Sequence, residues 1–105
     1  MANQNSGSTN KPIIVIIRSV GEDIERGGSC GANVDLYGSA EKNVTIEIKD
    51  QTAILSATQS DQYGAWKVTL DNLQHGLHVF AAGDAASGTV SDSYEVGYPK
   101  PPEPN

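Results

Sequence analysis

The chain has 105 residues, with 13 acidic side chains against 7 basic ones and a formal net charge of −6 at pH 7. A negative surface repels phosphate backbones and anionic lipid headgroups, which argues against partners such as nucleic acid or a membrane surface. The length is that of one domain. Eleven glycines among short strand-forming stretches favour an all-β fold.

The two ends of the chain differ in composition from its middle. Residues 1–11 are polar and of low complexity, which predicts a disordered linker or a remnant that is not native. Residues 99–105 contain four prolines, which favour an extended proline-rich linker over a sheet ladder. The first ten residues lack the basic start and apolar core of a signal peptide, and the apolar run 13–17 is too short to span a bilayer. We therefore expect one domain at 12–98. The chain is either cytoplasmic or a piece excised from a longer exported protein, and we favour the excised piece.

Alternating apolar residues between turn-forming clusters predict about seven strands. In chain order these are 13–18, 32–37, 44–49, 53–58, 66–70, 77–82 and 90–98. The segment Gly21–Gly28 is expected to be a long loop, and residues 50–52 the turn of a short hairpin. Short strands at this spacing predict a β-sandwich, with two antiparallel sheets packed face to face.

The expected core follows from the inward face of each strand. In strand 53–58 either Ile54 or Leu55 can point inward, and in strand 90–98 Tyr94, Val96 and Tyr98 share one face. The residues expected in the core are Ile13, Val15, Val34, Leu36, Val44, Ile46, Ile48, Leu55, Trp66, Val68, Leu70, Leu73, Phe80 and Val96.

The residues Leu73-Gln-His-Gly76 predict a corner that leads into strand 77–82. His78 follows this corner, and its imidazole N–H can donate to a backbone carbonyl as a tyrosine hydroxyl does at the corner of Ig-like sandwiches. We therefore expect His78 to be structural. His75 is three residues away, a spacing that does not aim both rings at one metal ion. Cys30 is the only cysteine, so no intrachain disulfide can form, and we expect a small buried side chain there.

A series of short motifs occupies residues 38–88: Gly38-Ser-Ala40, Val44-Thr-Ile46, Asp61-Gln-Tyr-Gly-Ala-Trp66, Leu73-Gln-His-Gly-Leu-His78 and Asp84-Ala-Ala-Ser-Gly88. In this order they resemble the bacterial Ig-like domains that are repeated in large surface proteins and adhesins, and the resemblance covers residues 12–98. It implies an Ig-like β-sandwich of about seven antiparallel strands and an extracellular or cell-surface location. Cys30 and a shortened strand segment at Ala81–Asp84 depart from the family's pattern.

Few aromatic residues are candidates for ligand contact. Trp66 could stack on a sugar, but it shares a face with Val68 and Leu70 and is expected in the core. The tyrosines expected to be more exposed are Tyr63, Tyr94 and Tyr98. No nucleophile motif, zinc-ligand spacing or phosphate-binding loop occurs, so the sequence predicts no catalytic residue and no enzyme.

Acidic residues gather in predicted loops and near strand ends: Glu22, Asp23 and Glu25, then Asp61, and then Asp84 with Asp92. Calcium takes six to eight oxygen ligands, often from carboxylates, and the resemblance implies that some related repeats bind calcium between domains. A solvated acidic loop is the favoured interpretation of residues 22–25, and no EF-hand loop is present. We therefore assign no metal ligand and no cofactor, and calcium stays an alternative.

These observations predict a monomeric, non-catalytic spacer module whose partners are the neighbouring domains of its parent chain. One alternative is a binding module that contacts host glycans or proteins through the loops Gly21–Gly28 and Gln59–Gly64. Another is an accessory domain of a secreted glycan-active enzyme.

Overall fold

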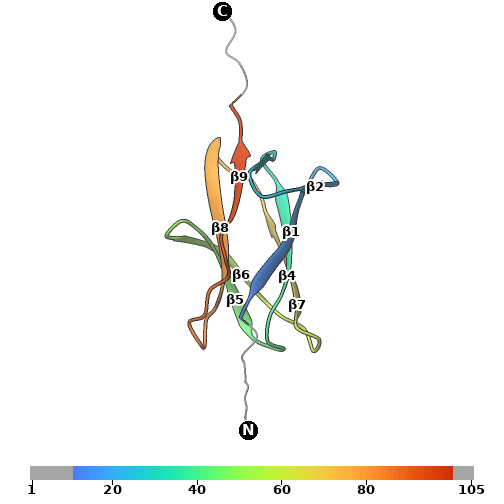
Figure 1. The fold of residues 1–105 in the computed structure, drawn as a ribbon, viewed down its shortest axis with the longest axis vertical. Helices are drawn as coiled ribbons and strands as arrows, with labels where there is room; N and C mark the ends of the chain where they lie inside the picture. The colour runs from blue at the N-terminus through green and yellow to red at the C-terminus, as the bar shows by residue number, and fades with distance from the viewer. Residues whose placement is uncertain (1–10, 101–105) are drawn as a thin grey trace, which may run out of the picture.

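The computed structural model describes residues 11–100. Of the linkers expected at 1–11 and 99–105, residues 1–10 and 101–105 lie outside this range. Two β-sheets face each other across one apolar layer (Figure 1), which confirms the predicted β-sandwich. Within the described residues no helix is long and apolar enough to cross a lipid bilayer. The strands are β1 (Ile13–Ser19), β2 (Glu22–Ile24), β3 (Gly28–Ser29), β4 (Val34–Ser39), β5 (Thr45–Asp50), β6 (Ala53–Gln59), β7 (Ala65–Leu70), β8 (Gly76–Asp84) and β9 (Tyr94–Tyr98).

The first sheet has the strand order β2-β1-β4-β7, and the second has the order β3-β9-β8-β5-β6. All pairs are antiparallel except β3 with β9, which is parallel. The seven long strands match the seven predicted ones. The last begins at Tyr94 instead of residue 90, and β8 continues through Asp84, where Asp84 pairs with Ile46. The segment Ala81–Asp84, which departs from the pattern of bacterial Ig-like domains, is therefore part of a regular strand.

The prediction that Gly21–Gly28 is a loop is wrong. Residues of β2 pair with β1, with Ile17 opposite Ile24, and β3 pairs with β9, with Gly28 opposite Val96. The chain thus crosses from one sheet to the other between two very short strands. Strands of three and two residues are too short to show an alternating pattern, so periodicity could not reveal them.

A β-bulge in β1 reverses which of its residues face the core. The register against β4 shifts between Ile14 and Ile16, and such an extra residue changes the side-chain parity of a strand. The expectation that Ile13 and Val15 lie in the core is therefore wrong. They are 49% and 60% exposed, and Ile14 and Ile17 are buried instead.

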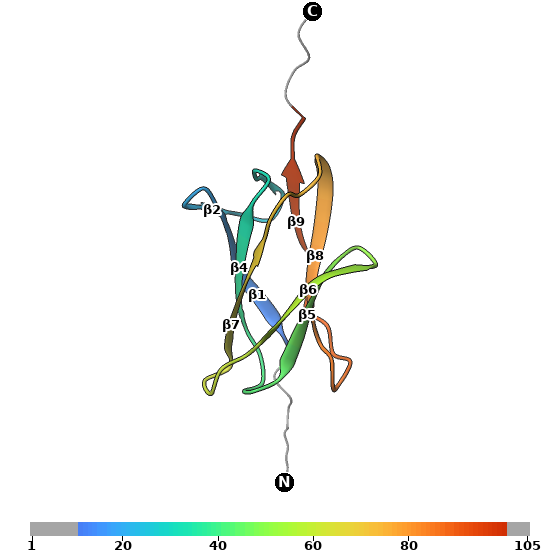
Figure 2. The ribbon, with the colours of Figure 1, turned by 180° about the vertical axis from the view of Figure 1, so that it is seen from behind.

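The edge strand β6 supplies no fully buried residue. The expectation that Leu55 lies in the core is wrong, since Leu55 is 42% exposed and its alternative Ile54 is 57% exposed. Only β5 pairs with β6, and the register of that pair shifts between Ile48 and Lys49. Seen from behind, the β5–β6 hairpin projects away from the body of the sandwich (Figure 2).

The rest of the expected core is buried or packs against the buried cluster. Val44 and Leu73 are partly buried at its margin, as is Tyr98. The buried cluster consists of Ile14, Ile17, Cys30, Val34, Leu36, Ala40, Ile46, Ile48, Trp66, Val68, Leu70, Phe80, Ala82, Tyr94 and Val96.

Trp66 is 4% exposed, which confirms that it belongs to the core. Its indole N–H donates to the carbonyl oxygen of Ser39 at 3.1 Å. The ring lies directly over Gly38, where a Cβ atom would stand 2.1 Å from the carbonyl oxygen of Ile13 and 2.2 Å from the indole. Only glycine fits beneath the tryptophan.

Gly38→Ala is expected to destabilise the fold by about 1–3 kcal/mol, because overpacking of a filled core has costs of this order. Chemical denaturation of the two proteins measures the difference. Gly97→Ala is the matched control, since Gly97 also lies in a strand but nothing stands within 4 Å of a Cβ built there. Equal stability of the Gly38 variant and the wild type would contradict the packing described here.

Candidate functional site

A buried polar cluster is centred on His78 of β8, which is 7% exposed. The ring nitrogen Nε2 lies 2.7 Å from the carbonyl oxygen of Gln74, and Nδ1 lies 2.6 Å from Oδ2 of Asp50. The predicted hydrogen bond from this histidine to a backbone carbonyl is therefore confirmed. The ring also stacks on Phe80, with centroids 5.6 Å apart.

Sequence reasoning missed Asp50, which it placed in a hairpin turn. Asp50 ends β5, and the pairing of β5 with β8 sets it opposite Phe80. Its Oδ1 accepts the backbone N–H of Val79 at 2.9 Å, while Oδ2 contacts the imidazole of His78. Because 28 residues separate Asp50 from His78, only the strand register could reveal the contact.

The cluster is suited to holding the fold and not to proton transfer to a substrate. Both ring nitrogens of His78 already face acceptors of the protein itself, and a general base needs a nitrogen within reach of its substrate. His75 is separate and stacks on Tyr98, with centroids 4.1 Å apart. Cys30 is buried, and desolvation raises the pKa of its thiol, which disfavours the reactive thiolate.

Two cavities lie near these histidines. Asp50 and His78 border a cleft of about 320 Å³ at the open edge between β6 and β7, which polar side chains and leucines line together. A second, shallow cavity of about 410 Å³ lies where β9 ends, beside His75, Leu77 and Tyr98.

The acidic residues singled out above are spread over the molecule, and the four aspartates among them have partners of their own. Asp23 forms an ion pair with Arg18 at 2.9 Å, and Asp92 forms one with Lys11 at 3.2 Å. Oδ1 of Asp84 accepts the N–H groups of residues 86 and 87 and so closes the turn after β8. Among residues 11–100, no three side chains of histidine, cysteine, aspartate or glutamate come together as ligands for a metal ion.

The segment Gly21–Gly28, considered above as a binding loop, is tied to the second sheet. The hydroxyl of Tyr94 donates to the carbonyl oxygen of Ile24, and the guanidinium of Arg26 lies 4.5 Å from the centre of the Tyr94 ring. The N–H of Gly27 donates to the carbonyl oxygen of Glu95 at 2.7 Å. These contacts show that the expectation of exposure for Tyr94 is wrong: it is 2% exposed.

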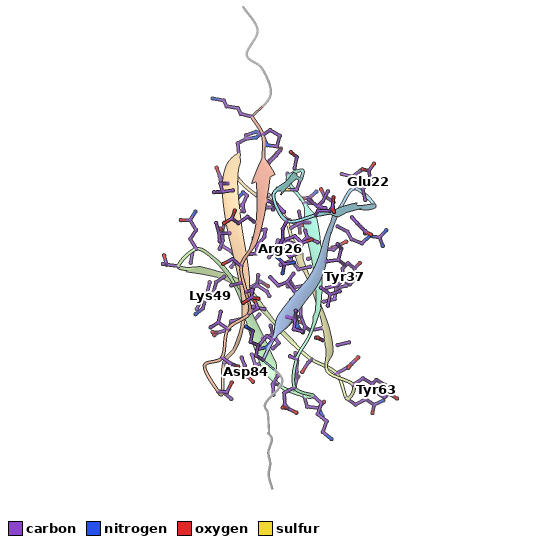
Figure 3. The ribbon with its side chains drawn as sticks, in the orientation of Figure 1. Glu22, Arg26, Tyr37, Lys49, Tyr63 and Asp84 are labelled. Carbon is purple, nitrogen blue, oxygen red and sulfur yellow. The ribbon has the colours of Figure 1, made fainter. Side chains whose placement is uncertain are left out.

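Tyr63 is the tyrosine that the fold presents to solvent, with 84% of its surface exposed. It lies on the turn before β7, at the end of the molecule where β1 begins (Figure 3). Oδ1 of Asp61 accepts the N–H groups of Tyr63 and Ala65 at 2.8 and 2.9 Å. Gly64 has φ 86° and donates to the carbonyl oxygen of Asp61 at 3.0 Å. The exposed ring therefore stands on a turn whose backbone is fixed by hydrogen bonds.

Comparison with known protein families finds no family model that matches this chain. Comparison with curated proteins finds no match either.

His78→Ala is expected to destabilise the fold by roughly 1–3 kcal/mol, because the carbonyl oxygen of Gln74 and Oδ2 of Asp50 both lose the imidazole as a hydrogen-bond partner. Urea denaturation monitored by Trp66 fluorescence measures the loss. His75→Ala, an exposed residue of the same corner, serves as the control and is expected to change stability by less. An unchanged midpoint for the His78 variant would refute its structural role.

Proposed function

We propose that the chain is a non-catalytic spacer module of a larger exported bacterial surface or adhesin-type protein. The observation that carries this proposal is the path of the chain through the sandwich. The described chain begins at one end of the long axis, where β1 starts, and reaches the opposite end where β9 finishes (Figure 1). A module of this shape adds its full length to a string of domains.

The arrangement of the two terminal strands also suits a module under tension. A pull between Lys11 and Lys100 acts along β1 and β9, which belong to different sheets. β1 is held by its ladders with β2 and β4, and β9 by its ladders with β8 and β3. The force then acts along the strands and loads many backbone hydrogen bonds at once. In the opposite case, a force across the strands, the hydrogen bonds would break one after another.

The family resemblance and the acidic surface support the same proposal. The motifs at residues 38–88 resemble those of bacterial Ig-like repeats, and the cluster around His78 stabilises a corner without leaving a nitrogen for catalysis. Net charge of one sign keeps neighbouring modules soluble and apart.

Force spectroscopy tests the mechanical part of the proposal. Pulling through residues 11 and 100 is expected to require a higher unfolding force than pulling through residues 51 and 100 at the same loading rate. The second geometry peels the edge strand β6 from β5, its neighbour in the sheet. Forced unfolding reports the unfolding barrier, so equal or reversed forces would count against a role under tension.

Tyr63 favours a second candidate function, the recognition of a glycan or protein by the turn Gln59–Gly64. An exposed aromatic ring on a preorganised turn loses little entropy on binding. Its place at the end of the molecule, away from both cavities, makes the turn a contact surface of its own.

A glycan array probed with the folded domain tests this second function. If the turn binds a glycan, Tyr63→Ala is expected to abolish the signal while leaving the Tm unchanged, because the ring buries almost no surface. Tyr37→Ala is the control, since Tyr37 lies on β4 in the first sheet and not on the turn Gln59–Gly64. Silence of the wild-type domain across the array would remove the glycan arm and leave the spacer proposal standing.

A further inference from the structure

The end of β5 meets the corner at residues 71–75 and the adjoining start of β8 at one unbroken chain of contacts. The carboxylate of Asp50, at the β5–β6 hairpin, accepts the backbone N–H of Val79 and contacts Nδ1 of His78. The other ring nitrogen, Nε2, contacts the carbonyl oxygen of Gln74, in the corner at residues 71–75 between β7 and β8. The hairpin is also joined to β8 by the N–H of Gln51, which donates to the carbonyl oxygen of Val79 at 2.9 Å.

The partners of the ring decide its protonation state. An ionised carboxylate and a backbone carbonyl are both acceptors only. A neutral imidazole has one N–H, so it could satisfy only one of two contacts that measure 2.6 and 2.7 Å. Two donors are required, and only the imidazolium supplies them. The geometry therefore needs one more proton than a neutral ring carries.

We propose that the Asp50–His78–Gln74 chain is a proton-operated latch. It ties the corner at residues 71–75 to the β5–β6 hairpin while His78 is protonated, and it releases the corner when one ring proton is lost. This inference does not depend on the proposed spacer function.

The order in which the contacts break follows from the strength of the acceptors. Hydrogen bonds to a charged acceptor are about twice as strong as those to a neutral one, so the remaining proton stays on Nδ1 beside Asp50. Nε2 then turns a lone pair toward the carbonyl oxygen of Gln74. The corner moves away on that side, where it borders the cleft between β6 and β7.

Few other charges surround the latch. From the corner, Asp71 also lines the cleft, and its negative charge favours the protonated ring. The edge strands contribute uncharged side chains there: Leu55 and Ser56 from β6, and Thr69 and Leu70 from β7. On β9 the residue opposite His78 is Val96. Asp50 and Asp71 are thus the groups that bias the protonation of His78.

The direction of the pKa agrees with this geometry. Burial desolvates the ring and acts to lower the pKa of His78, but the hydrogen bonds to Asp50 and Gln74 and the charge of Asp50 outweigh it, so the pKa is raised above 6.5. The folded protein then binds more protons than the unfolded chain. The stability from this group is complete below the unfolded pKa of about 6.5 and is lost as the pH rises through the folded pKa.

Nitrogen NMR of the histidine rings in the intact chain tests the latch directly. Below the transition both nitrogens of His78 are expected to carry protons. Above it, Nε2 alone is expected to become unprotonated, together with faster amide exchange in the corner at residues 71–75. A neutral ring at pH 6, or a proton that stays on Nε2 and leaves Nδ1, would overturn the proposal.

Stability against pH gives a second, independent readout. Between pH 5.5 and 8 the Tm of the wild type is expected to fall as the pH rises. Asp50→Asn removes the charged acceptor and is expected to move the fall to lower pH, and His78→Gln is expected to remove the histidine-dependent part of it. His75→Gln, three residues away and outside the latch, is expected to keep the wild-type profile. Burial raises the pKa of the Cys30 thiol as well. The pH range of this measurement therefore ends below the pH at which that thiol loses its proton.

The Asp50→Asn variant keeps the test decisive if the His78 variant does not fold. A wild-type Tm that is flat or rises over this range, or a profile that Asp50→Asn leaves unchanged, would refute the latch.

Discussion

A single layer of apolar side chains lies between the two sheets, and the rest of the molecule depends on it. A sandwich of this size buries only about 60–65% of the surface that its unfolded chain exposes, so each long inner strand must place one face on that layer. Trp66 shows how tightly the layer is filled, because its ring occupies the space that any side chain at position 38 would need. The bulge in β1 serves the same requirement, since it returns Ile17 to the layer after Ile14.

Polar groups complete the sandwich where the apolar layer ends. A cleft lies at the edge between β6 and β7, and the hydrogen-bonded pair of His78 and Asp50 borders it. Such a buried pair is stable only when every donor and acceptor has a partner. The second nitrogen of the ring meets that condition through Gln74, and the same requirement makes this end of the fold sensitive to a proton.

In the loops, too, polar groups form hydrogen bonds with partners in the protein. Asp61 and Asp84 each accept backbone N–H groups within their own turns, so these carboxylates stiffen the turns. Arg26 and Tyr94 fix the segment between β2 and β3 against the second sheet. The result is a module with short, tied connections and one prominently exposed aromatic ring at Tyr63, which is compatible with a stiff spacer that can also make an end contact.

The sequence alone determined the strand pattern wherever polar and apolar residues alternate, as in Val44–Lys49 and Trp66–Leu70, because a period of two assigns each residue to a face. It also determined the corner at His78, because Leu73, Gly76 and the histidine are close in the chain. Which residues of Ile13–Ile17 point into the core was decided by the tertiary structure. A uniform apolar run has no polar residue to mark the outer face, and the bulge depends on pairing with β4. The tertiary structure also decided the partner of His78, since Asp50 reaches the ring only through the register of β5 with β8. Local chemistry depends on neighbouring residues, whereas a contact across two strands exists only after the sheet has formed.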